Sequence, residues 1–207
     1  MHGSHARDGA DSAFVFEGNW RDFARIALPN LLLTIVTLGI YRFWATARER
    51  RYLWSRTRFV DENLEWAGTG MELFIGFVMV FVLFGIPYFG LSFVAQALVT
   101  RGYESLGIAL SAFAALAIFY LLGVARFRAL RYRLSRTRWR GIRGGSDTAG
   151  FLFGLSYMWK TAVGWIPAGL LLPWSMTSLW NERWSKMSFG PYAFEADAEA
   201  GNVFARY

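Results

Sequence analysis

Two long runs without a charged residue constrain this chain more than any other feature. Leu73–Thr100 holds 28 uncharged residues and Ser105–Ala125 holds 21, and only Arg101–Glu104 separates them. About 20 apolar residues allow an α-helix to cross the hydrocarbon core of a bilayer. Because the connection leaves room only for a tight turn, the sequence predicts two transmembrane helices packed as a hairpin.

The composition indicates that the rest of the chain is also embedded in a membrane. Of 207 residues, 55% are hydrophobic and 18% are charged, and the chain contains 10 Trp and 19 Phe. Soluble domains carry about 25% charged residues and rarely expose so much apolar surface. The lack of Cys argues against a secreted disulfide scaffold. We therefore predict an all-α integral membrane protein.

Two further apolar segments, at residues 23–45 and 150–181, are interrupted. The first contains Pro29 and Gly39. The second contains Lys160 and a group of helix-breaking residues, Gly164, Pro167, Gly169 and Pro173. Repeated breaks are typical of re-entrant or broken helices, but Pro and Gly also occur in plain spans. We expect about four membrane-embedded helical segments, namely two firm spans and two that either cross fully or dip in and return.

Most of the arginines lie in two short stretches that each follow an apolar run. Residues 42–58 contain six Arg and one acidic residue, and residues 126–143 contain eight Arg and none. Arg-rich flanks of membrane helices mark the cytoplasmic side, and they attract anionic lipid headgroups. The competing interpretation is a nucleic-acid patch, which the position of both stretches at the ends of apolar runs disfavours.

The Arg-rich stretches belong to an internal repeat. Residues 48–59 align with residues 128–139 at an offset of 80, with eight of twelve positions identical or conservative. A fainter third copy lies at an offset of 130, where Trp44 matches Trp174. The sequence therefore predicts a disordered tail at residues 1–12 and one membrane domain at 13–207, built of units at about 14–68, 69–146 and 147–207.

Small cytoplasmic β-hairpins are expected between the helical parts. In the first unit the turn is predicted at residues 61–63, after Arg58-Phe59, and in the last at Gly190-Pro191. A further short strand is expected at Phe14–Gly18. Since another apolar helix should follow the last hairpin, and the sequence stops at Tyr207, we expect either a truncated chain or a short relative of a longer protein.

Several of these motifs resemble one bacterial family. They are Thr37–Trp44, Arg48–Thr57, Gly68–Phe74 and Arg131–Arg143, and they are similar to motifs of the DUF898 (YjgN-like) inner-membrane proteins. The resemblance covers most of residues 14–207. It implies a multi-pass protein of the bacterial inner membrane, in a family whose members are usually longer. It implies no activity, because the family is named for its unknown function.

The sequence offers little material for catalysis. It has no Cys, and its two histidines, His2 and His5, lie in the predicted tail. The usual ligands of zinc and haem and the usual base for a nucleophile are therefore missing. Between Leu73 and Asp147 the only carboxylate is Glu104. We expect no enzyme activity, no catalytic residue, no metal site and no cofactor.

Two groups of residues are candidates for binding. The first would hold anionic lipid headgroups or an acidic partner, and comprises Arg48, Arg51, Tyr52, Arg56, Arg128, Arg131, Tyr132, Arg136, Arg138 and Trp139. Alternatively, its arginines pair with Asp61, Glu62, Glu65 and Glu72 and hold the β-hairpins in place. The second group comprises Lys160, Gln96 and Asn30, polar residues within apolar segments. These either line a polar pathway or serve packing, with Lys160 snorkelling to the interface and the others bonding between helices.

These patterns favour a non-enzymatic membrane subunit that associates with lipids, with a larger membrane complex or with copies of itself, and not with nucleic acid. The alternative is a passive transporter or channel for a small solute, because internal repeats recur in transporters. An enzyme that uses Glu65, Glu72 or Glu182 is the least favoured hypothesis.

Overall fold

The computed structural model describes residues 13–166 and 168–204, so the predicted disordered tail and Pro167 lie outside the described residues. The chain is mostly helical, with small antiparallel strands between the helices. It divides into two compact units. Within the described residues, unit 1 contains the chain up to Leu73 and Thr137–Gly141, and unit 2 contains Phe74–Arg136 and the chain from Ile142 onward.

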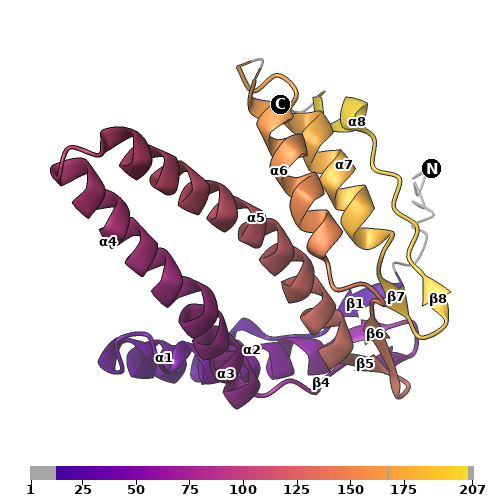
Figure 1. The fold of residues 1–207 in the computed structure, drawn as a ribbon. Coiled ribbons are helices and arrows are strands. Elements are labelled where there is room, and N and C mark those ends of the chain that lie inside the picture. Colours follow the sequence, from indigo (N-terminus) through magenta and orange to yellow (C-terminus); the bar gives the residue numbers. More distant parts are fainter. Residues whose placement is uncertain (1–12, 167, 205–207) are drawn as a thin grey trace, which may run out of the picture. The chain divides into compact units, whose positions relative to one another are not determined.

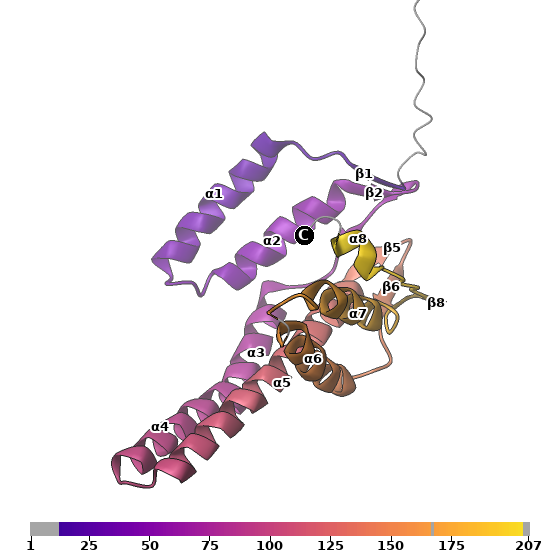
Figure 2. The ribbon, with the colours of Figure 1, turned by 90° about the horizontal axis from the view of Figure 1, so that it is seen from above.

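Unit 1 is a short helical hairpin closed by strands. Its helices α1 (Trp20–Val36) and α2 (Arg42–Ser55) lie side by side (Figure 2). The strands are β1 (Phe14–Phe16), β2 (Thr57–Phe59), β3 (Glu62–Asn63), β4 (Glu65–Trp66) and β5 (Thr137–Trp139). β1 pairs with β2, β2 with β3, and β4 with β5, all antiparallel.

The break predicted in the first apolar segment lies at Gly39. Leu38 and Gly39 adopt φ angles of 51° and 92°, which reverse the chain between α1 and α2. Pro29, in contrast, lies inside α1. The exposed residues of α1 are largely apolar, including Leu28, Leu31, Leu32 and Ile35, whereas Asn30 is buried. This distribution is the reverse of that in a water-soluble helix and suits contact with lipid.

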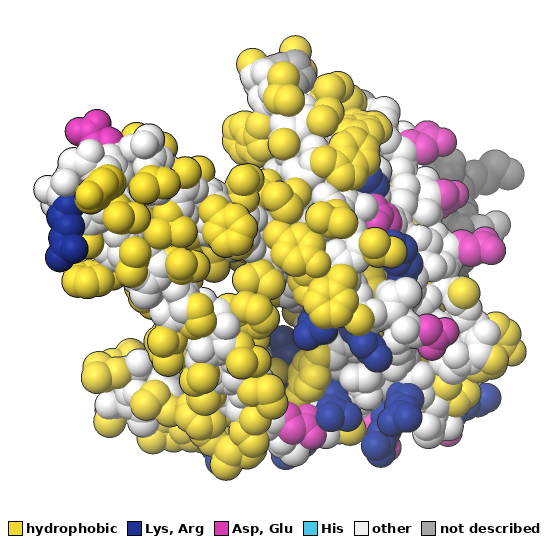
Figure 3. Space-filling model, viewed as in Figure 1, with side chains coloured by type: hydrophobic (Ala, Val, Ile, Leu, Met, Phe, Trp, Pro, Cys, Tyr) yellow, Lys and Arg dark blue, Asp and Glu magenta, His cyan; other side chains and the backbone are white. Residues whose placement is uncertain are grey.

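Two long helices form the hairpin at the start of unit 2 (Figure 1). The first is continuous from Gly70 to Thr100 and consists of α3 (Gly70–Val80), the π-helical segment η1 (Phe81–Gly85) and α4 (Ile86–Thr100). The second is α5 (Glu104–Arg136). The two predicted spans are confirmed as helices that are long and apolar enough to cross a membrane, with 31 and 33 residues. Hydrophobic side chains cover the face of this hairpin seen in Figure 3.

A second short helical hairpin follows in unit 2. It consists of α6 (Phe151–Trp165) and α7 (Leu172–Trp184), and the short helix α8 (Ala200–Phe204) comes after it. The strands are β6 (Ile142–Gly145), β7 (Ser188–Phe189) and β8 (Tyr192–Ala193), where β6 pairs with β7 and β7 with β8. The chain reverses at Ala168 and Gly169, with φ angles of 51° and 83°. Gly164 lies within α6 and Pro173 begins α7, so neither breaks a helix.

The core of unit 2 lies where α5 meets α6. Phe127 and Leu130 of α5 pack with Phe153 and Tyr157 of α6 and with Met187. Next to this cluster two glycines allow the helices to approach closely. A Cβ on Gly123 would lie 2.6 Å from Tyr157 Cβ, and a Cβ on Gly154 would lie 2.6 Å from the Tyr120 ring. Small residues at such crossings are typical of helix packing in membranes.

Every helical hairpin begins and ends at a pair of strands, in a matching register. Val15 lies opposite Arg58 across the first hairpin, Glu65 opposite Arg138 across the long one, and Gly145 opposite Ser188 across the last. Residues 58, 138 and 188 are separated by the offsets of 80 and 130 found in the sequence. The chain therefore returns, after each pair of helices, to the strand from which it started.

The two short hairpins correspond to each other in detail. Leu38-Gly39 and Ala168-Gly169 are related by the offset of 130, and all four residues have positive φ angles. A serine at the C-terminal end of α2, of α5 and of α7 also forms the same contact. The hydroxyls of Ser55, Ser135 and Ser185 each donate to the carbonyl three residues earlier. The two short hairpins therefore share their reversals, and all three serines share this contact.

The structure corrects the expected position of the first turn. The first β-hairpin turns at Val60 and Asp61 and not at residues 61–63, because Phe59 pairs with Glu62 and Val60 adopts a φ of 58°. Turn chemistry favours Asp and Asn over Val there, which misplaced the prediction. Within the apolar helices, the hydroxyls of Thr34, Ser92 and Thr100 donate to carbonyls of their own helices.

The close approach of α5 and α6 can be tested by substituting the two glycines at their crossing. Gly123→Ala and Gly154→Ala are expected to lower the free energy of unfolding by about 1–3 kcal/mol each, because the added methyl group overpacks the crossing. Gly90→Ala is the control, since a Cβ there meets nothing within 4 Å, and helix propensity should make it neutral or stabilising. Thermal unfolding in detergent measures all three. An equal rise in Tm for all three would contradict this packing.

Candidate functional site: arginines and buried ion pairs at the hairpin ends

The first Arg-rich block lies in unit 1 at the end of α2. Arg48 and Arg56 are exposed, and their guanidinium carbons lie 5.7 Å and 5.9 Å from the rings of Tyr41 and Tyr52. The Tyr52 hydroxyl is fixed by a hydrogen bond of 2.9 Å to the carbonyl of Asn19. Arg51 is exposed on the same helix. Aromatic stacking thus orients these guanidinium groups while their charges stay at the surface.

The strands that follow place Arg138 and Trp139 in the same unit. Arg138 is exposed on β5, opposite Glu65 on β4. The Trp139 indole donates to the Phe59 carbonyl at 3.1 Å, and the two rings meet edge to face at 5.0 Å. Trp139 is therefore held by β2, the strand that contains Phe59, and it packs against that strand.

The second Arg-rich block lies in unit 2 at the end of α5. Arg128 and Arg131 hold the loop before α6, with hydrogen bonds of 3.2 Å and 3.3 Å to the carbonyls of Ala149 and Thr148. Arg136 lies over the Tyr132 ring at 5.6 Å. That contact corresponds to Arg56 over Tyr52 in the first block, so the two copies orient their last arginine in the same way.

Two ion pairs at the β-hairpins involve arginines outside the candidate group, and one of them uses an expected acid, Asp61. Arg58 pairs with Glu17 at 3.4 Å, and Arg140 pairs with Asp61. Several candidate arginines form no ion pair with any residue that the structure describes: Arg48, Arg51, Arg56, Arg128, Arg131 and Arg138. Their charges are therefore not neutralised within this part of the chain.

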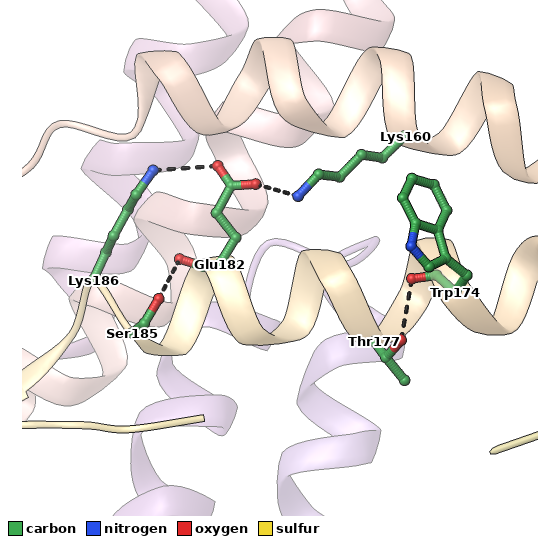
Figure 4. A network of polar contacts seen from close by, with 6 residues as sticks. All are labelled: Lys160, Trp174, Thr177, Glu182, Ser185 and Lys186. Atoms are coloured by element: carbon green, nitrogen blue, oxygen red, sulfur yellow. Dashed lines mark hydrogen bonds and ion pairs between the residues drawn. The ribbon is translucent and has the colours of Figure 1, made fainter. Parts of the chain in front are cut away.

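Lys160 is held in an ion-pair network between α6 and α7 (Figure 4). Its ammonium group lies 2.7 Å from one carboxylate oxygen of Glu182, and Lys186 lies 3.2 Å from the other. The Lys160 and Glu182 side chains are only 12% and 18% exposed. The side chain extends along the hairpin, and its charge ends at Glu182.

The charge of Glu182 is stabilised by this network. Burial by itself would raise the pKa of the carboxyl group. Hydrogen bonds from Lys160, Ser156 and Lys186 outweigh burial, and the pKa lies below the ordinary value of 4.5. Opposite charges on the two sides of a predicted helix break were the sequence signal for this pair, yet they do not identify which acid would be the partner.

The other two intramembrane candidates differ in their surroundings. Asn30 is 1% exposed, and its amide nitrogen lies 3.5 Å from the Ala45 carbonyl and from Glu49 Oε1, so it bonds to α2 as expected. It occupies the position of Lys160 at the offset of 130. Gln96 is exposed on α4. The three therefore do not line one site, since Asn30 lies in unit 1 and Lys160 has a charged partner.

A further cluster of positive charge was not singled out from the sequence. Arg126 of α5 donates a hydrogen bond to the Tyr157 hydroxyl. On α7, burial lowers the pKa of Arg183, and the charges of Arg133 and Arg126 lower it further. Arg183 Nε is buried and has no hydrogen-bond acceptor among the described residues. Excess positive charge thus gathers at this end of unit 2.

The Lys160–Glu182 pair predicts a clear effect of single substitutions. Glu182→Gln should lower the free energy of unfolding by about 1–3 kcal/mol, because it leaves the largely enclosed Lys160 charge without its partner. The double variant Lys160→Met/Glu182→Met should recover most of that loss. Because the pKa of Glu182 is lowered by folding, its contribution is present above pH 4.5 and is lost as the pH falls through the folded-state pKa.

Thermal unfolding in detergent between neutral and acidic pH measures both effects. The exposed Glu104→Gln in the helix connection is the control and should behave like the wild type. If Glu182→Gln matched this control, the network would contribute nothing to stability.

Comparison with known proteins places the chain in a family. The family described as "Bacterial protein of unknown function (DUF898)" matches residues 11–207. "Inner membrane protein YjgN" of Salmonella typhimurium is 29% identical over 140 residues, which are 68% of this chain and 32% of that protein. The protein of the same name from Escherichia coli O157:H7 is 31% identical over 136 residues, 66% of this chain and 31% of that protein.

The aligned part therefore spans about a third of the length of these curated relatives. No solved structure matches the chain significantly. The family match covers nearly the whole sequence, and the relatives agree with the two membrane-capable helices of unit 2. The chain belongs to the DUF898 family and is a protein of the bacterial inner membrane.

Proposed function

We propose that this chain is a non-enzymatic membrane subunit that binds anionic lipid headgroups through the arginines at the ends of its helical hairpins. The inner-membrane family and the long helical hairpin provide the setting. The proposal includes association with a larger membrane complex or with further copies of the chain. The exposed arginines without an ion pair would attract an acidic surface of such a partner.

One observation carries the proposal. Arg48, Arg56 and Arg128 are exposed, each lies over an aromatic ring, and none forms an ion pair with a described residue. Arg58 and Arg140, in contrast, are paired with carboxylates. A guanidinium group that is oriented but not neutralised suits a phosphate supplied from outside.

The strand pairs support a topology in which all hairpin ends lie on one side of the membrane. Because β1 pairs with β2 and β6 with β7, the segments α1–α2 and α6–α7 each leave and return to the same side. Their helices have 13 to 17 residues, about 20–25 Å, and α2 is rich in Arg. We therefore take α1–α2 as interfacial and α6–α7 as re-entrant, with the strands on the cytoplasmic side.

The alternative function, a passive transporter or channel, has less support. Its candidate residues are dispersed, since Asn30 packs against α2, Lys160 is bound by Glu182 and Gln96 is exposed. An enzyme is also less well supported, because Glu182 is engaged by two lysines.

Removal of the unpaired charges tests lipid binding. The triple variant Arg48→Gln/Arg51→Gln/Arg56→Gln should weaken retention of phosphatidylglycerol by about 100-fold, from about 1 kcal/mol per basic residue near the headgroups. Native mass spectrometry of the purified chain measures the retained lipid. Arg101→Gln, in the connection at the opposite end of the long hairpin, is the control and should retain lipid normally. Wild-type retention by the triple variant would refute the proposal.

The topology is tested by labelling with an impermeant maleimide, because the natural chain has no Cys. Ala13→Cys and Glu62→Cys should react only from the cytoplasmic side, and Tyr103→Cys only from outside. Leu38→Cys and Leu170→Cys lie at the tips of the short hairpins and should stay unlabelled because lipid covers them. Reaction of either tip from outside, or of Ala13→Cys and Glu62→Cys from opposite sides, would indicate plain spans.

A further inference from the structure

An apolar groove of about 310 Å³ runs along the long hairpin in unit 2. One wall is formed by α3 and η1, with Phe77, Phe81 and Phe84, and the other by α5, from Ile118 to Arg128. Figure 1 shows why it lies there, since the two long helices meet at their short connection and diverge toward the opposite end. The groove therefore opens along the part of the hairpin nearer the Arg-rich end.

The length of the groove corresponds to one leaflet. Ile118 and Arg128 are separated by ten residues of helix, which is about 15 Å at 1.5 Å per residue. The hydrocarbon core of a bilayer is about 30 Å thick, so each leaflet contributes about half of this. A lipid chain that begins at the level of Arg128 would thus follow the groove to the middle of the membrane.

A single charge closes the groove at its outer end. Among the described residues that line it, Arg128 is the one with a charged side chain. Its Nε donates to the Ala149 carbonyl at 3.2 Å, and its guanidinium carbon lies 5.0 Å from the Phe151 ring. These contacts fix the group in place and engage none of its terminal nitrogens, so both Nη groups are available for two oxygens of a phosphate.

The local backbone contributes to the shape of the groove. η1 is a π-helical segment, a feature that often occurs at functional sites. A Cβ on Gly85 would lie 2.9 Å from the Phe81 ring, so the glycine lets this ring lie flat against its own helix. The two helices are long and apolar enough to cross a membrane, where the molecules that match an apolar groove are acyl chains.

We propose that this groove is a binding site for one anionic phospholipid, whose acyl chain lies between η1 and α5 and whose phosphate binds Arg128. The inference rests on the proposed function and makes it specific. It predicts selection of a lipid by its tail and its headgroup together, beyond a general attraction of anionic headgroups to arginines.

The test separates tail from headgroup with matched variants of the full chain. Ala125→Phe fills the groove without changing charge, and Ala115→Phe adds the same ring at an exposed position of α5 that does not line the groove. Arg128→Gln removes the headgroup contact, and Arg131→Gln removes a charge one turn away. Native mass spectrometry with phosphatidylglycerol, and with phosphatidylcholine as the zwitterionic probe, measures the most tightly retained lipid.

We expect Arg128→Gln to reduce retention of that phosphatidylglycerol about fivefold, from about 1 kcal/mol per charge. Ala125→Phe should reduce retention of phosphatidylglycerol at least as much, whereas Ala115→Phe and Arg131→Gln should retain it like the wild type. The wild type should not retain phosphatidylcholine in the same way. A photoreactive acyl chain should crosslink to η1 and α5 in the wild type, and unchanged thermal unfolding of Ala125→Phe shows that it is folded.

If Ala125→Phe retained phosphatidylglycerol like the wild type, the proposed lipid site in the groove would be wrong. Equal effects of Arg128→Gln and Arg131→Gln would also contradict it. The proposed function would still stand in either case, provided that the triple Arg variant of α2 loses lipid. If that triple variant also retained lipid, both the site and the proposed function would be wrong.

Discussion

The antiparallel strand pair that closes each helical hairpin is the constraint on which this structure depends. Val15 opposite Arg58, Glu65 opposite Arg138 and Gly145 opposite Ser188 tie both ends of a hairpin together. A pair of strands cannot have a bilayer between them. In the proposed topology each helical segment therefore enters and returns on one side, whether its helices are long enough to cross, as α5 is, or shorter, as α7 is. The same arrangement, a helical hairpin whose two ends are joined by a strand pair, thus occurs with helices of different lengths.

This arrangement explains where charge and apolar surface lie. The end of each hairpin faces the strands, so the arginines that follow the helices gather there, and aromatic rings orient several of them. The helices away from the strands expose leucine and phenylalanine and bury small residues at their crossings, as at Gly123 and Gly154. A membrane provides little hydrophobic force between helices, so close packing and satisfied polar groups must hold them together.

Features encoded by local composition were predictable from the sequence. The uncharged runs of Leu73–Thr100 and Ser105–Ala125 identified both long helices. The helix-breaking residues showed that the other two segments are interrupted, but not that Gly39 and Gly169 mark the reversals. The turn at Val60 was not predictable, since valine rarely adopts a positive φ and the register of the strands imposes it. Partners across a hairpin, and the divergence that opens the groove, depend on packing that a single sequence does not report.

The polar residue at the centre of each short hairpin shows how one position is adapted twice. Asn30 and Lys160 correspond at the offset of 130, and both are enclosed between two helices. A neutral amide can be satisfied by a backbone carbonyl, and in the first hairpin Asn30 reaches the Ala45 carbonyl as well as Glu49 Oε1. A buried ammonium group requires a carboxylate, and the last hairpin supplies Glu182, which Lys186 also contacts. Since the last hairpin relies on an ionised carboxylate, its stability should fall at acidic pH, and the two hairpins should differ in their sensitivity to pH although their backbones correspond.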